Sequence, residues 1–275
     1  MFIKKLKSKL FVNVTHFHAL CRRYVSLIFA DKLALCTLIF QAPVMVLLMF
    51  LALKSDFTYK EAPVTMFIVA CVCVIMATLN SYQEICKERE ILIRETNAGL
   101  DSTSYVLSKV FIQGIICLFQ ALVLVVGTAL FVDFNISSVG SYLNYFFFTF
   151  LILLSSTCIG LFISALLKNS NSAILPVLFI IIAQVVFSGA IIDIPENLSF
   201  LSIFAISSFA LGGYSHIFNF AGLAHDIELQ TGLPIKLKPV FTQSYATCVL
   251  VMIGISLLCV ILTVLLVRKL RKKKF

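Results

Sequence analysis

Residues 87–109, KEREILIRETNAGLDSTSYVLSK, separate two apolar runs that are each long enough to cross a membrane. The first half alternates charge, with Glu90 and Arg94 at the i, i+4 spacing that favours a helical ion pair. Gly99 predicts the end of that helix, and Asp101 offers an N-cap for the next one. A solvated loop is the simpler interpretation of this charged run. A docking element for a cytoplasmic partner is the more specific interpretation.

The composition indicates a membrane protein with many spans. Hydrophobic residues make up 60% of the 275 residues and charged residues only 13%, which excludes an ordinary soluble domain. The net charge of +9 is therefore interpreted by its position along the chain, as a topology signal, and not as affinity for nucleic acid. The nine cysteines fall in apolar runs or on the predicted cytoplasmic side, so no disulfide framework is predicted.

Six uncharged stretches are long enough to cross about 30 Å of hydrocarbon at about 1.5 Å per residue. They are Leu33–Leu53, Val64–Gln83, Val110–Val132, Ser141–Leu167, Ala173–Ile192 and Tyr245–Val267. Residues 1–32 place basic side chains among apolar ones, which predicts an amphipathic helix in the interface plane. The predicted fold is an all-α polytopic membrane protein in which residues 1–275 form a single transmembrane domain.

The charge distribution predicts the orientation. Residues 197–225 are also uncharged, but a seventh crossing would move the basic tail 268–274 outside, against the positive-inside rule. With six crossings, all but four of the 22 Lys and Arg residues lie inside, and both termini are cytoplasmic. Spans one to five then occupy residues 33–193. We expect residues 194–243 to form an outer loop with re-entrant helices, before the last span and basic tail in 244–275.

The sequence contains no motif for catalysis or for a bound metal. It lacks the G-x-x-x-x-G-K-[ST] phosphate loop, so the chain is not expected to bind ATP itself. It also lacks H-E-x-x-H, G-x-S-x-G and C-x-x-C. No charged residue lies well inside the six predicted spans, which disfavours an ion-coupled carrier. Among the uncharged polar residues of the spans, Asn80 and Gln184 either bond neighbouring helices or line a substrate path.

The central stretch resembles the segment between the second and third transmembrane helices of ATP-binding-cassette transporters of the G subfamily and of bacterial ABC-2 type permeases. The matching positions are Glu88, Arg89, Glu95, Gly99, Ser104-Tyr105 and Lys109. Residues 17–43, with Arg22-Arg23-Tyr24, are similar to the connecting helix and first span of bacterial members. Phe187-Ser188-Gly189 is a third match, near the end of the fifth span. Many G-subfamily chains carry their own ATPase; here a separate ATPase subunit is implied.

The resemblance implies roles for three groups of residues. Coupling of ATP-driven closure to the spans would involve Glu88, Arg89, Glu90, Arg94, Glu95, Gly99 and Asp101. A substrate pathway between two subunits would be lined by Cys73, Met76, Asn80, Gln184 and Val185. An outer valve would follow at Phe187, Gly189, Ala190 and Ile191.

We therefore expect the permease subunit of an ATP-driven exporter in the cell membrane, which moves a hydrophobic or amphipathic cargo by alternating access. The cargo would be a peptide such as a bacteriocin or toxin, a lipid or a drug-like molecule, because small ions need a polar path. The expected partners are two ATPase subunits that hold ATP and Mg, a second and identical permease chain, and membrane lipid. Two alternatives stay open: lipid-linked glycan export, and a structural or regulatory membrane subunit without a pathway of its own.

Overall fold

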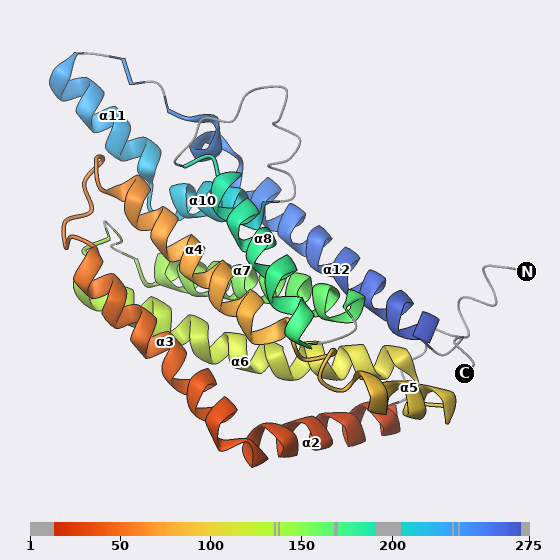
Figure 1. Cartoon of the computed structure of the whole chain (residues 1–275). Coiled ribbons are helices and arrows are strands. Elements are labelled where there is room, and N and C mark those ends of the chain that lie inside the picture. The colour runs from red at the N-terminus through yellow and green to blue at the C-terminus, as the bar shows by residue number, and fades with distance from the viewer. Residues whose placement is uncertain are drawn as a thin grey trace, which may run out of the picture.

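The computed structural model describes residues 14–134, 136, 138–167, 170–190, 205–232, 234–235 and 237–270. In these residues the chain is built from helices and contains no β-strand (Figure 1). The prediction of an all-α polytopic membrane protein is confirmed in this part of the chain.

The long helices agree closely with the predicted spans. They are α3 (Lys32–Ala52), α4 (Ala62–Ser81), α6 (Ser102–Phe131), α7 (Val139–Leu166) and α12 (Tyr245–Leu270). Each of these five is long and apolar enough to cross a membrane. The predicted fifth span corresponds to α8 (Ser170–Val186), which is only 17 residues long. Residues 191–204 lie outside the described residues, so a sixth crossing stays a prediction.

Helix α6 begins at the predicted cap and extends beyond the predicted span. The expected span began at Val110, whereas α6 begins at Ser102 and continues unbroken for 30 residues. Asp101 caps it, since its carboxylate accepts from the backbone N–H of Thr103 and Ser104. The charged residue Lys109 therefore lies within a packed helix and is not part of a loop.

Helix α7 lies at the centre of the bundle and packs against α4, α6 and α12 (Figure 1). Small side chains allow this close packing. A Cβ atom added to Gly160 of α7 would lie 2.0 Å from Ser81 Oγ and 2.9 Å from the carbonyl oxygen of Thr78 in α4. The contact between α4 and α7 thus requires glycine at this position.

The region predicted as an outer loop contains α10 (Ile206–Ile217), α11 (Phe220–Thr231) and the short 3-10 helix η2 (Pro239–Thr242). Helix α10 is buried along most of its length and packs against α4, α7 and α12. Re-entry of these helices into the membrane stays a prediction.

At the opposite end of the bundle, α2 (Val14–Ala30) packs along α6 and then turns into α3 at Asp31 (Figure 1). This helix covers the described part of the predicted amphipathic segment, since residues 1–13 lie outside the description. The short helix α5 (Arg89–Asn97) lies near the same end of α6. The helices α2, α5 and α6 together form the surroundings of the predicted coupling residues.

Candidate coupling site

The turn between α5 and α6 forms as the sequence predicts. Helix α5 ends at Asn97, and Gly99 adopts a φ of +109°, which disfavours any side chain. The N–H of Leu100 then donates to the carbonyl of Glu95 at 2.9 Å, which satisfies one of the free carbonyls at the helix end. Asp101 follows as the cap of α6, so the two helices are joined by a compact, hydrogen-bonded corner.

Helix α5 has one face packed into the protein and one face exposed. Leu92 and Thr96 are buried on the inner side. The exposed residues repeat at a spacing of three and four, as expected for one face of a helix. We call them the docking face: Lys87, Glu90, Ile91, Arg94, Asn97 and Ala98. Ile91 is 46% exposed in the middle of this charged and polar surface.

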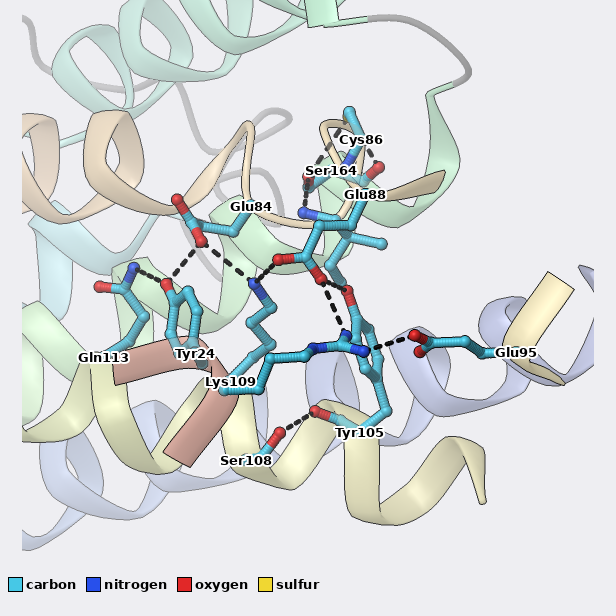
Figure 2. Close-up of polar contacts among 12 residues, drawn as sticks. Tyr24, Glu84, Cys86, Glu88, Glu95, Tyr105, Ser108, Lys109, Gln113 and Ser164 are labelled. Atoms are coloured by element: carbon cyan, nitrogen blue, oxygen red, sulfur yellow. Dashed lines mark hydrogen bonds and ion pairs between the residues drawn. The ribbon is translucent and has the colours of Figure 1, made fainter. Parts of the chain in front are cut away.

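Behind α5, the ammonium group of Lys109 is buried and surrounded by acceptors. Its side chain is only 2% exposed, and its Nζ lies 2.9 Å from Glu88 Oε1 and 3.3 Å from Glu84 Oε2. Figure 2 shows Lys109 between these two carboxylates. Tyr105 donates from its hydroxyl to Glu88 Oε2 at 3.0 Å. A buried ammonium group requires such partners, because its desolvation is otherwise very unfavourable.

Helix α2 joins this group through two adjacent residues. Tyr24 donates to Glu84 Oε2 at 2.5 Å, and its ring lies 3.6 Å from Lys109 Nζ. Burial, together with the negative charge of Glu84, raises the pKa of the Tyr24 phenol well above its usual value, so the hydroxyl keeps its proton. Arg23 contacts Glu95 at 2.5 Å and Glu88 at 3.6 Å. We call the whole set the coupling network: Arg23, Tyr24, Glu84, Glu88, Glu95, Tyr105 and Lys109.

The segment before α5 is attached to the end of α7. The hydroxyl of Ser164 accepts from the N–H groups of Ile85 and Cys86 at 2.9 and 3.0 Å. Arg89 Nη1 donates to the carbonyl of Leu167 at 2.6 Å. This cation therefore satisfies a free carbonyl at the negative end of the α7 dipole.

Helix α12 reaches the other side of the same corner. Arg268 Nη2 donates to Thr103 Oγ1 at 2.7 Å, in the first turn of α6. Burial alone would raise the pKa of Asp101, but hydrogen bonds from Ser104 and Thr103 and the charge of Arg268 lower it below 3.8. Helix α5 and its flanking turns are thus bonded to α2, α6 and α7, and they lie next to the end of α12. The short helix α5 therefore lies at the surface where four longer helices meet.

The predicted coupling residues separate into two groups. Glu88, Arg89, Glu95 and Asp101 point into the protein and form the bonds described above. Glu90, Arg94 and Gly99 are exposed. Within the described residues, no ion pair joins Glu90 to Arg94. Their exposure accounts for this difference from the predicted pair, since water weakens attraction between surface charges.

The predicted pathway residues lie inside the subunit or between its helices. Cys73 and Met76 are completely buried. Asn80 of α4 donates to Gln120 of α6 at 3.3 Å. Gln184 is also buried and bonds to Ser207 at the start of α10, whereas Val185 is half-buried. These bonds link neighbouring helices, and a pathway along α4 and α8 stays a prediction.

The predicted valve residues follow directly after α8. Phe187 is half-buried, and Gly189 has a φ of +74°, so the chain turns there in a conformation that favours glycine. The carbonyl of Ala190 accepts from Lys238 Nζ at 3.2 Å, which connects the end of α8 to the segment before η2. Ile191 lies outside the described residues. The valve role of this turn stays a prediction.

Sequence reasoning gave no coupling role to Arg23, Tyr24, Glu84, Tyr105 or Lys109. Glu84 and Lys109 lay directly beside the predicted spans, and a charge so close to an apolar span was itself a signal of a buried partner. Arg23 and Tyr24 lie far from the stretch in sequence, so no local pattern connects them to it. Within the described ranges, no group of three His, Cys, Asp or Glu residues is arranged to hold a metal ion.

Comparison with protein families places this chain beside a known transporter family. The model of the ABC-2 type transporter family matches residues 15–220, about three quarters of the chain, which includes α2, the central stretch and α10. A comparison with curated proteins gives no match. The matched family consists of transmembrane permease components that lack the ATP-binding cassette and generally work with an ATPase subunit. The match over residues 15–220, which agrees with the helical architecture, shows that the chain belongs to the ABC-2 type transporter family.

Proposed function

We propose that this permease serves an ATP-driven exporter of hydrophobic or amphipathic cargo, and that its ATPase subunit binds the docking face of α5. A homodimer of the permease with two ATPase subunits, which hold ATP and Mg, is the assembly that we favour. The proposal rests on the two faces of α5. The outer face exposes Ile91, whereas Glu95 and the N-cap residue Glu88 bond to residues inside the protein.

The chemistry of the docking face supports a protein partner. An exposed isoleucine surrounded by Glu90, Arg94 and Asn97 combines an apolar anchor with a polar rim, the pattern of residues that contribute most to binding. The partner groove would accept Ile91 and carry charges complementary to Glu90 and Arg94. A bare loop between two spans would need neither the helix nor its hydrogen-bonded corner.

The coupling network supplies the link from this face to the spans. A shift of α5 moves Glu88 and Glu95, which are bonded to Arg23 of α2 and Lys109 of α6. Because ion pairs join specific groups, a displaced α5 would favour other partners for Glu88 and Glu95. Arg23 and Lys109 would then shift, and α2 and α6 would move with them. ATP bound by the partner can drive transport only through such a preference between access states.

The direction of transport and the class of cargo are parts of the proposal. Apolar side chains dominate α4 and α8, and Asn80 and Gln184 are engaged by neighbouring helices. A path along these helices suits an apolar or amphipathic molecule such as a peptide, lipid or drug-like compound. Cys73 and Met76 would join such a path only after α4 moves relative to the helices packed against it, because both side chains are buried here.

The test is the substitution Ile91→Asp, with Leu229→Asp on α11 as its matched control. Both residues are exposed apolar side chains on short helices, at opposite ends of the bundle. We expect Ile91→Asp to weaken co-purification of the nucleotide-binding subunit about thirtyfold, as for an anchor residue, and to abolish cargo-stimulated ATP hydrolysis. Equal co-purification for both variants and the unchanged chain would overturn the docking assignment.

A further inference from the structure

A cavity of about 250 Å³ lies in the corner formed by α2, α3 and α6. Its lining is apolar and includes Val25 and Phe29 of α2, Leu35 and Ile39 of α3, and Ile112 and Ile116 of α6. Such a cavity offers water no hydrogen-bond partner, so it does not hold water stably. Its walls also lack packing contacts as long as the cavity is empty.

The surroundings of the cavity identify what can enter it. Helices α3 and α6 are both candidate spans, and α2 turns into α3 (Figure 1) between the lining residues Phe29 and Leu35. If α3 and α6 cross the membrane, the cavity would face the hydrocarbon of the leaflet at the α5 end of the bundle. A lipid acyl chain is the apolar molecule present there at high concentration, and each buried methylene group stabilises binding.

Two basic residues lie near the lining residues along α2 and α3. Arg22 precedes Val25 by three residues on α2, and Lys32 precedes Leu35 by three residues on α3. This spacing places each cation about one turn before the apolar lining on its helix, and Arg22 also lines a neighbouring hollow on α2 with His18 and Ser26. Both are exposed. The neighbouring carboxylate of Asp31 accepts from the N–H of Ala34 as the cap of α3.

We propose that the corner of α2, α3 and α6 binds a membrane phospholipid, with an acyl chain in the cavity and the phosphate held by Arg22 and Lys32. The site is distinct from the proposed cargo pathway along α4 and α8. Tyr24 of the coupling network adjoins Val25 of the cavity. A bound lipid would therefore hold α2 at a fixed position against α6 and make coupling sensitive to the lipid composition.

The experiment uses the complete chain, purified with its partner and placed in phosphatidylcholine nanodiscs. These contain a minor fraction of phosphatidylglycerol with a photoreactive acyl chain, and the labelled peptides are mapped. We expect labelling to concentrate on α2, α3 and α6 near the cavity. Ile116→Phe and Val25→Phe, which fill the cavity, should reduce it, whereas Leu257→Phe on the exposed face of α12 should not.

Variants of Arg22 and Lys32 test separately whether these residues bind the lipid phosphate. Because both side chains are exposed, we expect their replacement to leave the fold intact. Arg22→Gln and Lys32→Gln should each weaken retention of phosphatidylglycerol about fivefold, whereas Lys269→Gln, another exposed lysine, should leave it unchanged. Labelling spread evenly over the exposed helices would overturn the site. Equally strong labelling by a photoreactive diacylglycerol, which has no phosphate, would overturn the role of the two basic residues.

Discussion

The two ends of the helical bundle are held together by different chemistry. At the α5 end, the coupling network joins three carboxylates and two cations over a few ångströms. At the α11 end, an aromatic cluster packs around Phe218, with hydrogen bonds such as that between Thr128 and Tyr145 beside it. Phe218 lies 4.4 Å from Phe134, 5.0 Å from Tyr145 and 5.3 Å from Phe57, measured between ring centroids.

This difference in contacts indicates which end of the bundle can pass a movement of α5 on to the long helices. Ring contacts are numerous and weakly directional, so an aromatic cluster stabilises one packed arrangement. Ion pairs and hydrogen bonds join specific atoms, so we propose that the coupling network exchanges partners when α5 is displaced. We therefore expect substitutions at the α5 end to affect coupling most, and substitutions at the α11 end to affect stability most.

The largest effect is expected for Lys109→Met. Removing the ammonium group leaves Glu84 and Glu88 close together and mostly buried, which destabilises a protein by about 3–5 kcal/mol. Cargo-stimulated ATP hydrolysis should be lost, and the melting temperature of the purified chain should fall. The double variant Lys109→Met with Glu88→Gln should recover part of the stability but not the coupling. An unchanged melting temperature for the single variant would contradict the network.

Phe218→Ala tests the other end of the comparison. The substitution removes a ring that contacts four aromatic neighbours and should reduce stability by about 3 kcal/mol. The protein that stays folded should still bind the ATPase subunit and hydrolyse ATP in response to cargo. Loss of coupling without loss of thermal stability would contradict the proposal that the α11 end contributes to stability and the α5 end to coupling.

Arg23→Gln should have a smaller effect on stability and a clear effect on coupling. The side chain is 37% exposed, so its pairs with Glu88 and Glu95 contribute about 1 kcal/mol or less after screening by water. We expect reduced stimulation of ATP hydrolysis at an almost unchanged melting temperature. Lys269→Gln removes an exposed charge near the same end and should leave both unchanged. Equal behaviour of the two variants would remove Arg23 from the network.

The smallest effect is expected for Asp101→Ala. Loss of this cap destabilises α6 by about 1 kcal/mol near neutral pH. The pKa of Asp101 is lowered by folding, so its contribution is present above 3.8 and is lost as the pH falls through the lower folded value. The melting temperatures of the variant and the unchanged chain should therefore converge under acidic conditions. A difference that persists there would show that the carboxylate charge is not involved.

The sequence predicted features that depend on local order. The end of α5 at Gly99 and the cap at Asp101 follow from the conformational preferences of these residue types, and the structure shows both. Long apolar runs likewise predicted the five long helices, because length and composition alone decide whether a segment can cross a membrane.

The sequence did not predict contacts between distant segments. The pairs of Arg23 with Glu88 and Glu95, and of Lys109 with Glu84, depend on how α2, α5 and α6 pack, which no local pattern records. The predicted third span began at Val110 because it followed hydrophobicity, whereas the polar first turns of α6, directly after the predicted cap at Asp101, are also helical and buried. For the same reason, Lys109 was placed outside the interior.

The most direct test of the central claim is a photo-crosslink from position 91. A photoreactive amino acid replaces Ile91 in one variant and Leu229 in another, and both are irradiated in native membranes, with the crosslinked proteins identified. If α5 is the docking element, position 91 will crosslink to a nucleotide-binding subunit, and the yield will change when ATP is trapped. Position 229 will give no such product. Failure of position 91 to crosslink to an ATPase, or equal products from both positions, would contradict the account.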